Sequence, residues 1–188
     1  MGAHPRADDV HADRRRGLLD AAGRLRPLRG RLDRVRRAGH RAALRARLAQ
    51  GAHPLTGVIA YEWRGEFAND AVNVLHAEGF GHPYLDIDWH TQVHRHSLGW
   101  VCARDGEELV GFVNVAWDGD AHAFVLDTLV ASHARRRGIG TGLIATAVEH
   151  AKAAGCEWLH VDFEDHLAGY YFDACGFVPT RAGLIALR

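Results

Sequence analysis

The chain has 188 residues, 47% of them hydrophobic, and its 23 Lys and Arg balance its 23 Asp and Glu to a formal net charge of zero. This length suffices for one domain with a substantial core, or one domain plus an appendage. No run approaches the roughly 18 apolar residues of a membrane span, and the start lacks the basic-then-apolar order of a signal peptide. The three cysteines each lie in an apolar run, and their odd number argues against a disulfide framework. A reducing, cytoplasmic location is therefore expected.

The charge is distributed very unevenly along the chain. Residues 1–53 contain 14 Arg and 5 Asp, a balance of +9, whereas residues 54–188 carry a balance of −9. Residues 1–55 are predicted to be an Arg-, Ala- and Leu-rich extension, disordered or loosely helical, and residues 56–188 a folded domain. Three interpretations of the extension stay open: an arm that binds nucleic-acid or membrane phosphates, a helix that covers the acidic domain or pairs with a second copy, and a segment without function.

The rest of the chain alternates between strand and helix patterns. The apolar periodicity and the turn residues predict strand 58–63, helix 67–77, an irregular helix 86–96, strands 98–103 and 109–117, strand 124–130, a helix from the glycines at 138–142 to Gly155, strand 158–163, a short helix 167–174, and a strand or hairpin over 177–187. Asp105-Gly106 is a strong hairpin signal between strands 98–103 and 109–117. This order predicts an α/β domain with a mixed sheet.

The most informative stretch runs from residue 124 to residue 155. Its strand leads through three consecutive arginines into Gly138-Ile139-Gly140-Thr141-Gly142, which opens a helix. A glycine loop at a helix start directs several backbone N–H groups and the positive end of the helix dipole at one point, which favours a phosphate. Glycine lets the phosphate approach the backbone, because a Cβ would hold it off. An anionic ligand is therefore expected here.

The spacing of the glycines identifies the class of anion. A Walker loop would need Lys followed by Ser or Thr, and a dinucleotide fingerprint would need G-x-G-x-x-G; neither is present. The stretch resembles motif A of the GNAT acetyltransferases, Arg/Gln-x-x-Gly-x-Gly/Ala, with Arg135, Gly138 and Gly140 at the matching positions, whereas Ser132 and Arg136 depart from the residues common in the family. The resemblance covers about residues 57–188 and implies the GNAT fold. It also implies that the loop amides hold the pyrophosphate of acetyl-CoA while the strand holds its pantetheine arm. The cofactor-binding residues so implied are Leu129, Val130, Arg135, Arg136, Arg137, Gly138, Ile139, Gly140, Thr141 and Gly142.

A second family motif, Asn-x-x-Ala-x-x-Phe-Tyr-x-x-x-Gly-Phe, is partly present over residues 165–177. Ala168, Gly176 and Phe177 match it, but Phe172 stands where the family has the Tyr that protonates the CoA thiolate. Tyr171 is one residue earlier, about 100° round an ideal helix, so it serves as the acid only if the helix is rotated or bulged. The alternative is that these aromatic residues simply pack.

The base of the reaction is harder to place in the sequence. An alkylammonium with a pKa of about 10.4 must lose a proton before it attacks a thioester, which costs roughly 4–5 kcal/mol at pH 7. Asp127 and Glu164 are the catalytic candidates among the carboxylates near the central strands, with Asp162 and Glu62 as further possibilities. His90 and His94 lie four residues apart on a helix, but no third ligand follows at motif spacing, so no metal site is expected.

These observations predict an N-acetyltransferase that moves an acetyl group from acetyl-CoA to a primary amine by direct attack. The acceptor is expected to be a small-molecule or side-chain amine that arrives as a cation, because the acidic domain attracts positive charge. A non-catalytic acyl-CoA-binding or regulatory module, and a nucleic-acid-binding protein that uses the basic arm, are the alternatives. A homodimer is left open, and no membrane partner is expected.

Overall fold

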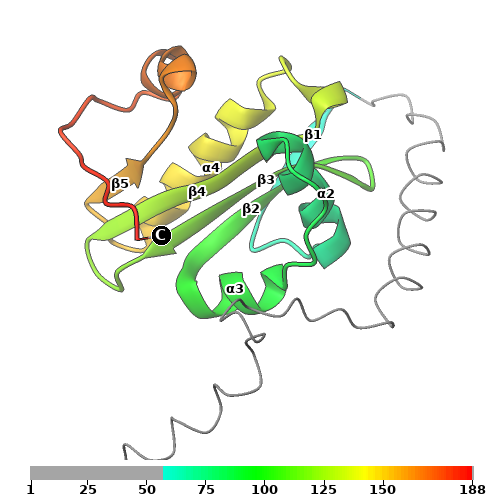
Figure 1. Ribbon diagram of the computed structural model, residues 1–188, viewed down its shortest axis with the longest axis horizontal. Helices are drawn as coiled ribbons and strands as arrows, with labels where there is room; N and C mark the ends of the chain where they lie inside the picture. Colours follow the sequence, from blue (N-terminus) through cyan, green and yellow to red (C-terminus); the bar gives the residue numbers. More distant parts are fainter. Residues whose placement is uncertain (1–56, 188) are drawn as a thin grey trace, which may run out of the picture. The chain divides into compact units, whose positions relative to one another are not determined.

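The computed structural model describes residues 57–187, so the expected extension over residues 1–55 lies outside the described residues. The described part is a mixed sheet with helices packed against it (Figure 1). Its elements are β1 (Ile59–Trp63), α2 (Asn69–Phe80), α3 (Trp89–His96), β2 (Ser97–Asp105), β3 (Glu108–Trp117), β4 (His122–Val130), the 3₁₀ turn η3 (Ser132–Ala134), α4 (Ile139–Ala153), β5 (Trp158–Val161), the 3₁₀ turn η4 (Asp165–Leu167) and the π-helix η5 (Gly169–Ala174).

The sheet has five strands in the described residues, in the order β1-β2-β3-β4-β5. The first four strands are antiparallel neighbours, and the predicted Asp105-Gly106 hairpin joins β2 to β3, with Gly106 at φ +60°. Strand β5 is parallel to β4, and α4 forms the crossover between them, as a parallel pair requires. The mixed α/β class predicted from the sequence is therefore confirmed.

The two faces of the sheet are covered by different helices. On one face, Leu143, Ile144 and Ala147 of α4 are buried, and Trp63 of β1 stacks on His150 of the same helix. Successive strand residues point to opposite faces. Trp100 of β2 accordingly lies on the other face, where its ring contacts the α3 residue His94. The core thus spans both sides of the sheet, with α2 and α3 opposite α4.

The C-terminal part departs from the sequence prediction. The helix predicted over 167–174 is divided into the 3₁₀ turn η4 and the π-helix η5. The strand or hairpin predicted over 177–187 is wrong, because these residues have no regular structure. Leu184, Ile185 and Leu187 are each more than four-fifths exposed. The apolar side chains that suggested a strand therefore do not pack against the sheet.

A buried ion pair fixes the loop that precedes α4. Arg137 Nη1 lies 2.9 Å from Oδ2 of Asp105, and the Asp105 side chain is 2% exposed. Asp105 is the last residue of β2, so this contact joins the loop to the β2–β3 hairpin. The backbone groups at the start of α4 are thereby held against the sheet.

Replacing Asp105 by Ala is expected to lower the free energy of unfolding by about 2–3 kcal/mol, because the guanidinium of Arg137 loses this partner. A fully buried pair would lose about 3–5 kcal/mol, but the Arg137 side chain is 26% exposed. Urea denaturation measures the change. Glu108→Ala is the control, since Glu108 pairs with His133 at the surface, and it should change the free energy by less than about 0.5 kcal/mol. Equal effects in the two variants would contradict a structural role for the buried pair.

Candidate functional site

Strand β4 extends beyond its parallel neighbour. Strand β5 pairs with β4 only over residues 122–125 of β4, whereas β4 continues to Val130. The edge of β4 from Leu126 to Val130 therefore has no β5 residue beside it. Figure 1 shows this part of β4 leading towards the start of α4. A strand edge of this kind can pair its backbone groups with an extended ligand.

A β-bulge lies within this free edge. Phe112 is opposite Leu129 and Asn114 is opposite Leu126, so Asp127 and Thr128 together face a single residue of β3. Asp127 has φ +52°, a left-handed conformation that is unfavourable for a residue with a side chain. Bulges often redirect a side chain beside an active site, and strained backbone of this kind is concentrated at functional positions. The bulge thus marks Asp127 as a functional candidate.

Asp127 contacts two polar side chains that the sequence did not associate with it. His76 Nε2 of α2 lies 3.6 Å from Asp127 Oδ1, and the amide of Asn114 also hydrogen-bonds the carboxylate. Ser97 Oγ donates to Asn114 Oδ1 at 2.5 Å, which leaves the amide nitrogen of Asn114 for Asp127. The Asp127 side chain is 20% exposed, and burial raises the pKa of its carboxyl group despite the nearby His76.

The three glycines before and within α4 serve different purposes. Gly138 has φ +77°, and a Cβ placed on it would meet nothing within 4 Å. A Cβ on Gly140 would lie 2.7 Å from the Tyr170 hydroxyl, and one on Gly142 would lie 2.2 Å from the Tyr61 hydroxyl. Gly140 and Gly142 therefore leave room for tyrosine rings of the protein itself. Only Gly138 leaves open space for a ligand.

The three consecutive arginines also differ in their contacts. Arg135 Nε donates to the Val130 carbonyl at 3.1 Å, and Arg137 is paired with Asp105. Arg136 is exposed and has φ +63°, at the position where the sequence departs from the glycine common in GNAT proteins. Two of the three arginines expected beside a phosphate, Arg135 and Arg137, thus already have partners within the protein.

The π-helix η5 brings Tyr171 to the free edge of β4. Cys175 N donates to Tyr170 O, which is the i→i+5 hydrogen bond of a π-bulge. A bulged helix is the condition under which Tyr171 was expected to replace the tyrosine of the family motif. The Tyr171 side chain is buried and stacks on Phe163, and its hydroxyl faces Thr128 of β4. Burial raises the pKa of Tyr171, so the phenol keeps its proton at neutral pH.

Two buried hydroxyl groups along this edge lack a well-formed hydrogen bond in the described residues. They are Thr128 Oγ1, in the bulge, and Tyr170 Oη, which lies against Gly140. Buried polar groups without partners are costly, and each one calls for an explanation. The Tyr171 hydroxyl faces that of Thr128, and the Cys175 thiol faces that of Tyr170, so each buried hydroxyl has a polar neighbour within the protein.

The carboxylates singled out in the sequence are not brought together. Glu164 is in the loop after β5, its side chain is 85% exposed, and Oε2 lies 3.3 Å from His166 Nδ1. Glu62 of β1 accepts a hydrogen bond from Arg104. Asp127 alone among these candidates lies in the bulge. The contribution of His76 was missed, because periodicity shows only that it lies on a helix and not which strand residue it meets.

The histidines of α3 have structural contacts. His90 Nε2 bonds the Phe67 carbonyl, and His94 Nδ1 bonds the His90 carbonyl. No three His, Cys, Asp or Glu side chains within residues 57–187 lie close enough together to hold a metal ion. No helix in this part of the chain is long and apolar enough to cross a membrane.

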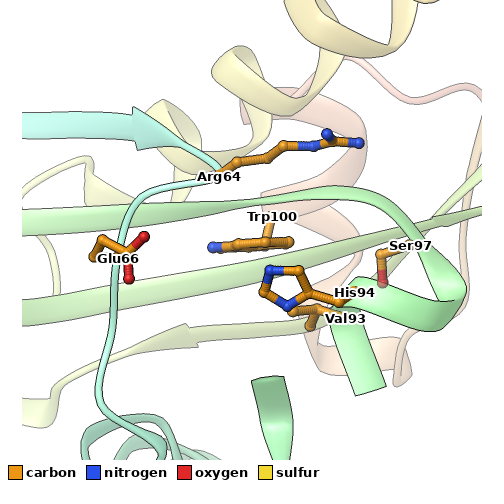
Figure 2. Close-up of a pocket in the computed structure, with 6 residues that line it drawn as sticks. All are labelled: Arg64, Glu66, Val93, His94, Ser97 and Trp100. Carbon is orange, nitrogen blue, oxygen red and sulfur yellow. The ribbon is translucent and has the colours of Figure 1, made fainter. Parts of the chain in front are cut away.

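A pocket of about 210 Å³ lies on the α3 side of the sheet, near the start of β2. Figure 2 shows its lining residues, which are Arg64, Glu66, Val93, His94, Ser97 and Trp100. Trp100 is held by the hydrogen bond from its Nε1 to the Gly65 carbonyl. Ser97 joins this pocket to the bulge through Asn114, so the two regions share one polar network.

Comparison with solved structures shows that this fold is widespread. An acetyltransferase of the GNAT family from Streptococcus pneumoniae superposes with a TM-score of 0.57 at 24% identity, over 70% of this chain and 98% of its own. AAC(6')-Iy, solved with the bisubstrate analogue CoA-S-monomethyl-acetylneamine, gives a TM-score of 0.57 at 17% identity, over 70% of this chain and 98% of its own.

Sequence comparison gives the family directly. A mycothiol acetyltransferase of Mycobacteroides abscessus is 29% identical over 92 residues, which are 47% of this chain and only 28% of that protein. The model of the acetyltransferase (GNAT) family matches residues 60–177, more than half of the chain, and this range contains the free edge of β4, the glycine loop and η5. The resemblance seen in the two sequence motifs is confirmed: the chain belongs to the GNAT family of acetyltransferases.

Proposed function

We propose that this protein is an N-acetyltransferase that moves an acetyl group from acetyl-CoA to a primary amine by direct attack. The observation that carries the proposal is the free edge of β4, which runs from the Asp127 bulge to the open start of α4. One end of this edge presents a carboxylate, and the other presents backbone N–H groups to an anion. A thioester bound along the edge would lie between them.

The described residues fit acetyl-CoA. Backbone N–H groups from Arg136 to Thr141 would face its pyrophosphate, with Gly138 leaving the space for it. The N–H of Gly142, expected from the sequence to take part, instead donates to the Gly138 carbonyl at 3.0 Å. The pantetheine arm would lie along Leu129 and Val130, whose edge has no β5 residue beside it. A ligand amide that donates to the Val130 carbonyl would replace the Arg135 hydrogen bond and release that guanidinium for the phosphates. The acetyl thioester supplies the acyl group.

Two side chains are assigned to the chemical step. The carboxylate of Asp127 takes the proton of the acceptor ammonium, and the free nitrogen then attacks the thioester carbonyl. Tyr171 donates its phenolic proton to the sulfur as the carbon–sulfur bond breaks. The nitrogen, now bonded to the acetyl carbon, loses its second proton as the amide forms, and this proton restores the phenol. The thiolate is already a tolerable leaving group, with a pKa of about 8.5, so the acid is expected to contribute on the order of 10²-fold.

The acceptor is proposed to be a small or side-chain amine. Residues 54–188 carry a balance of −9, which favours a cation. Two acidic residues of the domain have structural contacts, however: Asp88 caps α3 at Thr91, and Glu78 accepts from the Ser132 amide. Attraction of the amine therefore rests on the general charge of the domain and on Asp127.

Thiol release from acetyl-CoA tests the proposed activity, with 1,5-diaminopentane, 2-phenylethylamine and free lysine as probe acceptors. Release that depends on an amine supports the proposal. Binding of CoA without release from any amine would instead favour the acyl-CoA-binding module, to which Phe172 at the acid position points.

Gly138→Ala is expected to weaken CoA binding at least about 10-fold, because the new Cβ would lie where the amides approach the phosphate. Calorimetry with CoA measures the affinity. Gly119→Ala is the matched control, since Gly119 also has positive φ and open space but lies in the turn between β3 and β4. Both variants share the left-handed strain of about 1–2 kcal/mol, so only the binding should distinguish them. Unchanged affinity in folded Gly138→Ala would contradict the assignment of the loop.

Tyr171→Phe is expected to lower kcat on the order of 10²-fold while CoA affinity stays constant, because the ring still packs on Phe163 and only the acid is lost. Steady-state kinetics and calorimetry measure the two quantities. Tyr61→Phe removes another partly buried hydroxyl, from β1, and should leave kcat unchanged. An unaltered kcat in Tyr171→Phe would show that the thiolate leaves without this acid.

A further inference from the structure

A chain of three polar contacts leads from Asp127 towards the surface. Asp127 Oδ1 lies 3.6 Å from His76 Nε2, and His76 Nδ1 lies 2.8 Å from His82 Nε2. His82 Nδ1 lies 2.7 Å from the Pro83 carbonyl oxygen. These contacts join the bulge of β4, helix α2 and the loop that follows α2.

The carbonyl at the end of this chain sets the tautomers of the two histidines when both are neutral. A carbonyl oxygen only accepts, so His82 Nδ1 carries the hydrogen, and neutral His82 has a bare Nε2. That Nε2 accepts from His76 Nδ1, which leaves the Nε2 of neutral His76 bare and facing the Asp127 carboxylate. Two lone pairs then face each other across 3.6 Å. A proton that arrives at Asp127 relieves this repulsion.

We propose that His76 and His82 form a proton relay that takes the acceptor's proton from Asp127 towards solvent. This proposal rests on the proposed acetyl transfer and adds to it the path of the proton. Asp127 is the group that touches the acceptor, and His76 is a positioning and relay residue behind it. Nothing in the sequence motifs assigns a role to either histidine.

The surroundings of His76 suit proton transfer. Its side chain is 17% exposed, and its ring packs against Phe80 and Trp89 at centroid distances of 4.7 and 5.1 Å. Within the described residues, the titratable groups that face it are Asp127 of β4 and His82 of the loop. Burial lowers the pKa of His76 and raises that of Asp127, so the proton affinities of the two groups approach each other. Transfer between groups of similar affinity needs little driving force.

The relay is held from both sides by buried amides. Asn73 of α2 is 1% exposed; its Oδ1 accepts from Trp89 Nε1 at 2.9 Å, and its Nδ2 donates to the Ile87 carbonyl at 2.9 Å. These bonds fix Trp89, which packs on His76, and the loop that carries His82. Asn114 fixes Asp127 from the opposite side. The side chains of the relay are therefore held near one another before any ligand binds.

The proposed step balances in protons. The N–H bond of the ammonium breaks and an O–H bond forms on Asp127; this proton moves to His76 Nε2, and the Nδ1 proton of His76 moves to His82 Nε2. The charge then resides on the imidazole of His82, which is partly exposed and can release a proton to water. Acetylation of an ammonium by a thioester yields amide, thiol and one proton, and the relay carries that proton.

The relay identifies the class of acceptor that needs it. An alkylamine is almost entirely protonated at neutral pH and must lose a proton before attack, whereas a weakly basic arylamine is already neutral. A device that removes protons from Asp127 benefits only the first class. The acceptor is therefore assigned to the alkylamines, which include side-chain and polyamine nitrogens.

The pH dependence of His76→Gln in the full chain tests the relay, with the alkylamine that is turned over fastest among 1,5-diaminopentane, 2-phenylethylamine and lysine. At pH 7 kcat/KM is expected to fall on the order of 10²-fold. The deficit should shrink as the pH approaches the pKa of the alkylamine, about 10, because the substrate then arrives without its proton. A deficit that is constant with pH, or none, would overturn the relay. His82→Gln should give a smaller loss with the same pH trend.

His122→Gln is the matched control. His122 Nδ1 and His160 Nε2 form a second His–His contact of 2.8 Å, at the opposite end of β4 from the glycine loop. Its kcat/KM should equal that of the unaltered chain at every pH. A loss in His122→Gln with the same pH trend would show that the effect is not specific to His76.

Nitrogen-15 NMR of the histidines gives a readout that needs no turnover. Neutral His76 should carry its hydrogen on Nδ1, and Asp127→Asn should shift its titration. The opposite tautomer would overturn the relay whether or not the protein transfers acetyl groups. Conversely, the expected tautomer together with no thiol release from any amine would overturn the proposed function and the catalytic role of the relay, leaving only the hydrogen-bonded chain.

Discussion

The bulge in β4 is the constraint on which the rest of the candidate site depends. It places two residues opposite one, and it holds Asp127 in a left-handed conformation that would ordinarily be avoided. The resulting shift turns the carboxylate towards α2 and Thr128 towards η5. Beyond it, β4 has no parallel neighbour, so one local irregularity is associated with both the carboxylate and the free strand edge.

The fold could be predicted from the sequence to a large extent, because it depends on periodic burial. The strand before the glycines and the stripe of Leu143, Ile144 and Ala147 follow from apolar spacing alone. The strand expected over 177–187 did not form, since an apolar pattern does not supply a partner. The sequence showed only that Tyr171 needs a bulged helix to act as the acid. It could not predict that the π-helix forms, because this depends on how the segment packs after β5.

The candidate site was predictable only where it is made of local backbone. The glycine loop can be recognised from consecutive residues, yet its three glycines have different roles. Two of them leave room for tyrosines more than 25 positions away in the sequence. The partners of Asp127 come from α2 and β3, and no spacing rule connects them to β4. Long-range contacts of this kind decide pKa shifts, and they are absent from any single stretch of sequence.

The free edge of β4 has a consequence for how this region can vary. Recognition through main-chain N–H and C=O groups uses atoms that every residue except proline provides. The side chains of Leu129 and Val130 are thus constrained by the packing of the sheet, and only weakly by what lies along the edge. Substitutions there that preserve burial and backbone conformation would be nearly neutral for an extended ligand, whereas proline would remove a donor that no side chain can replace.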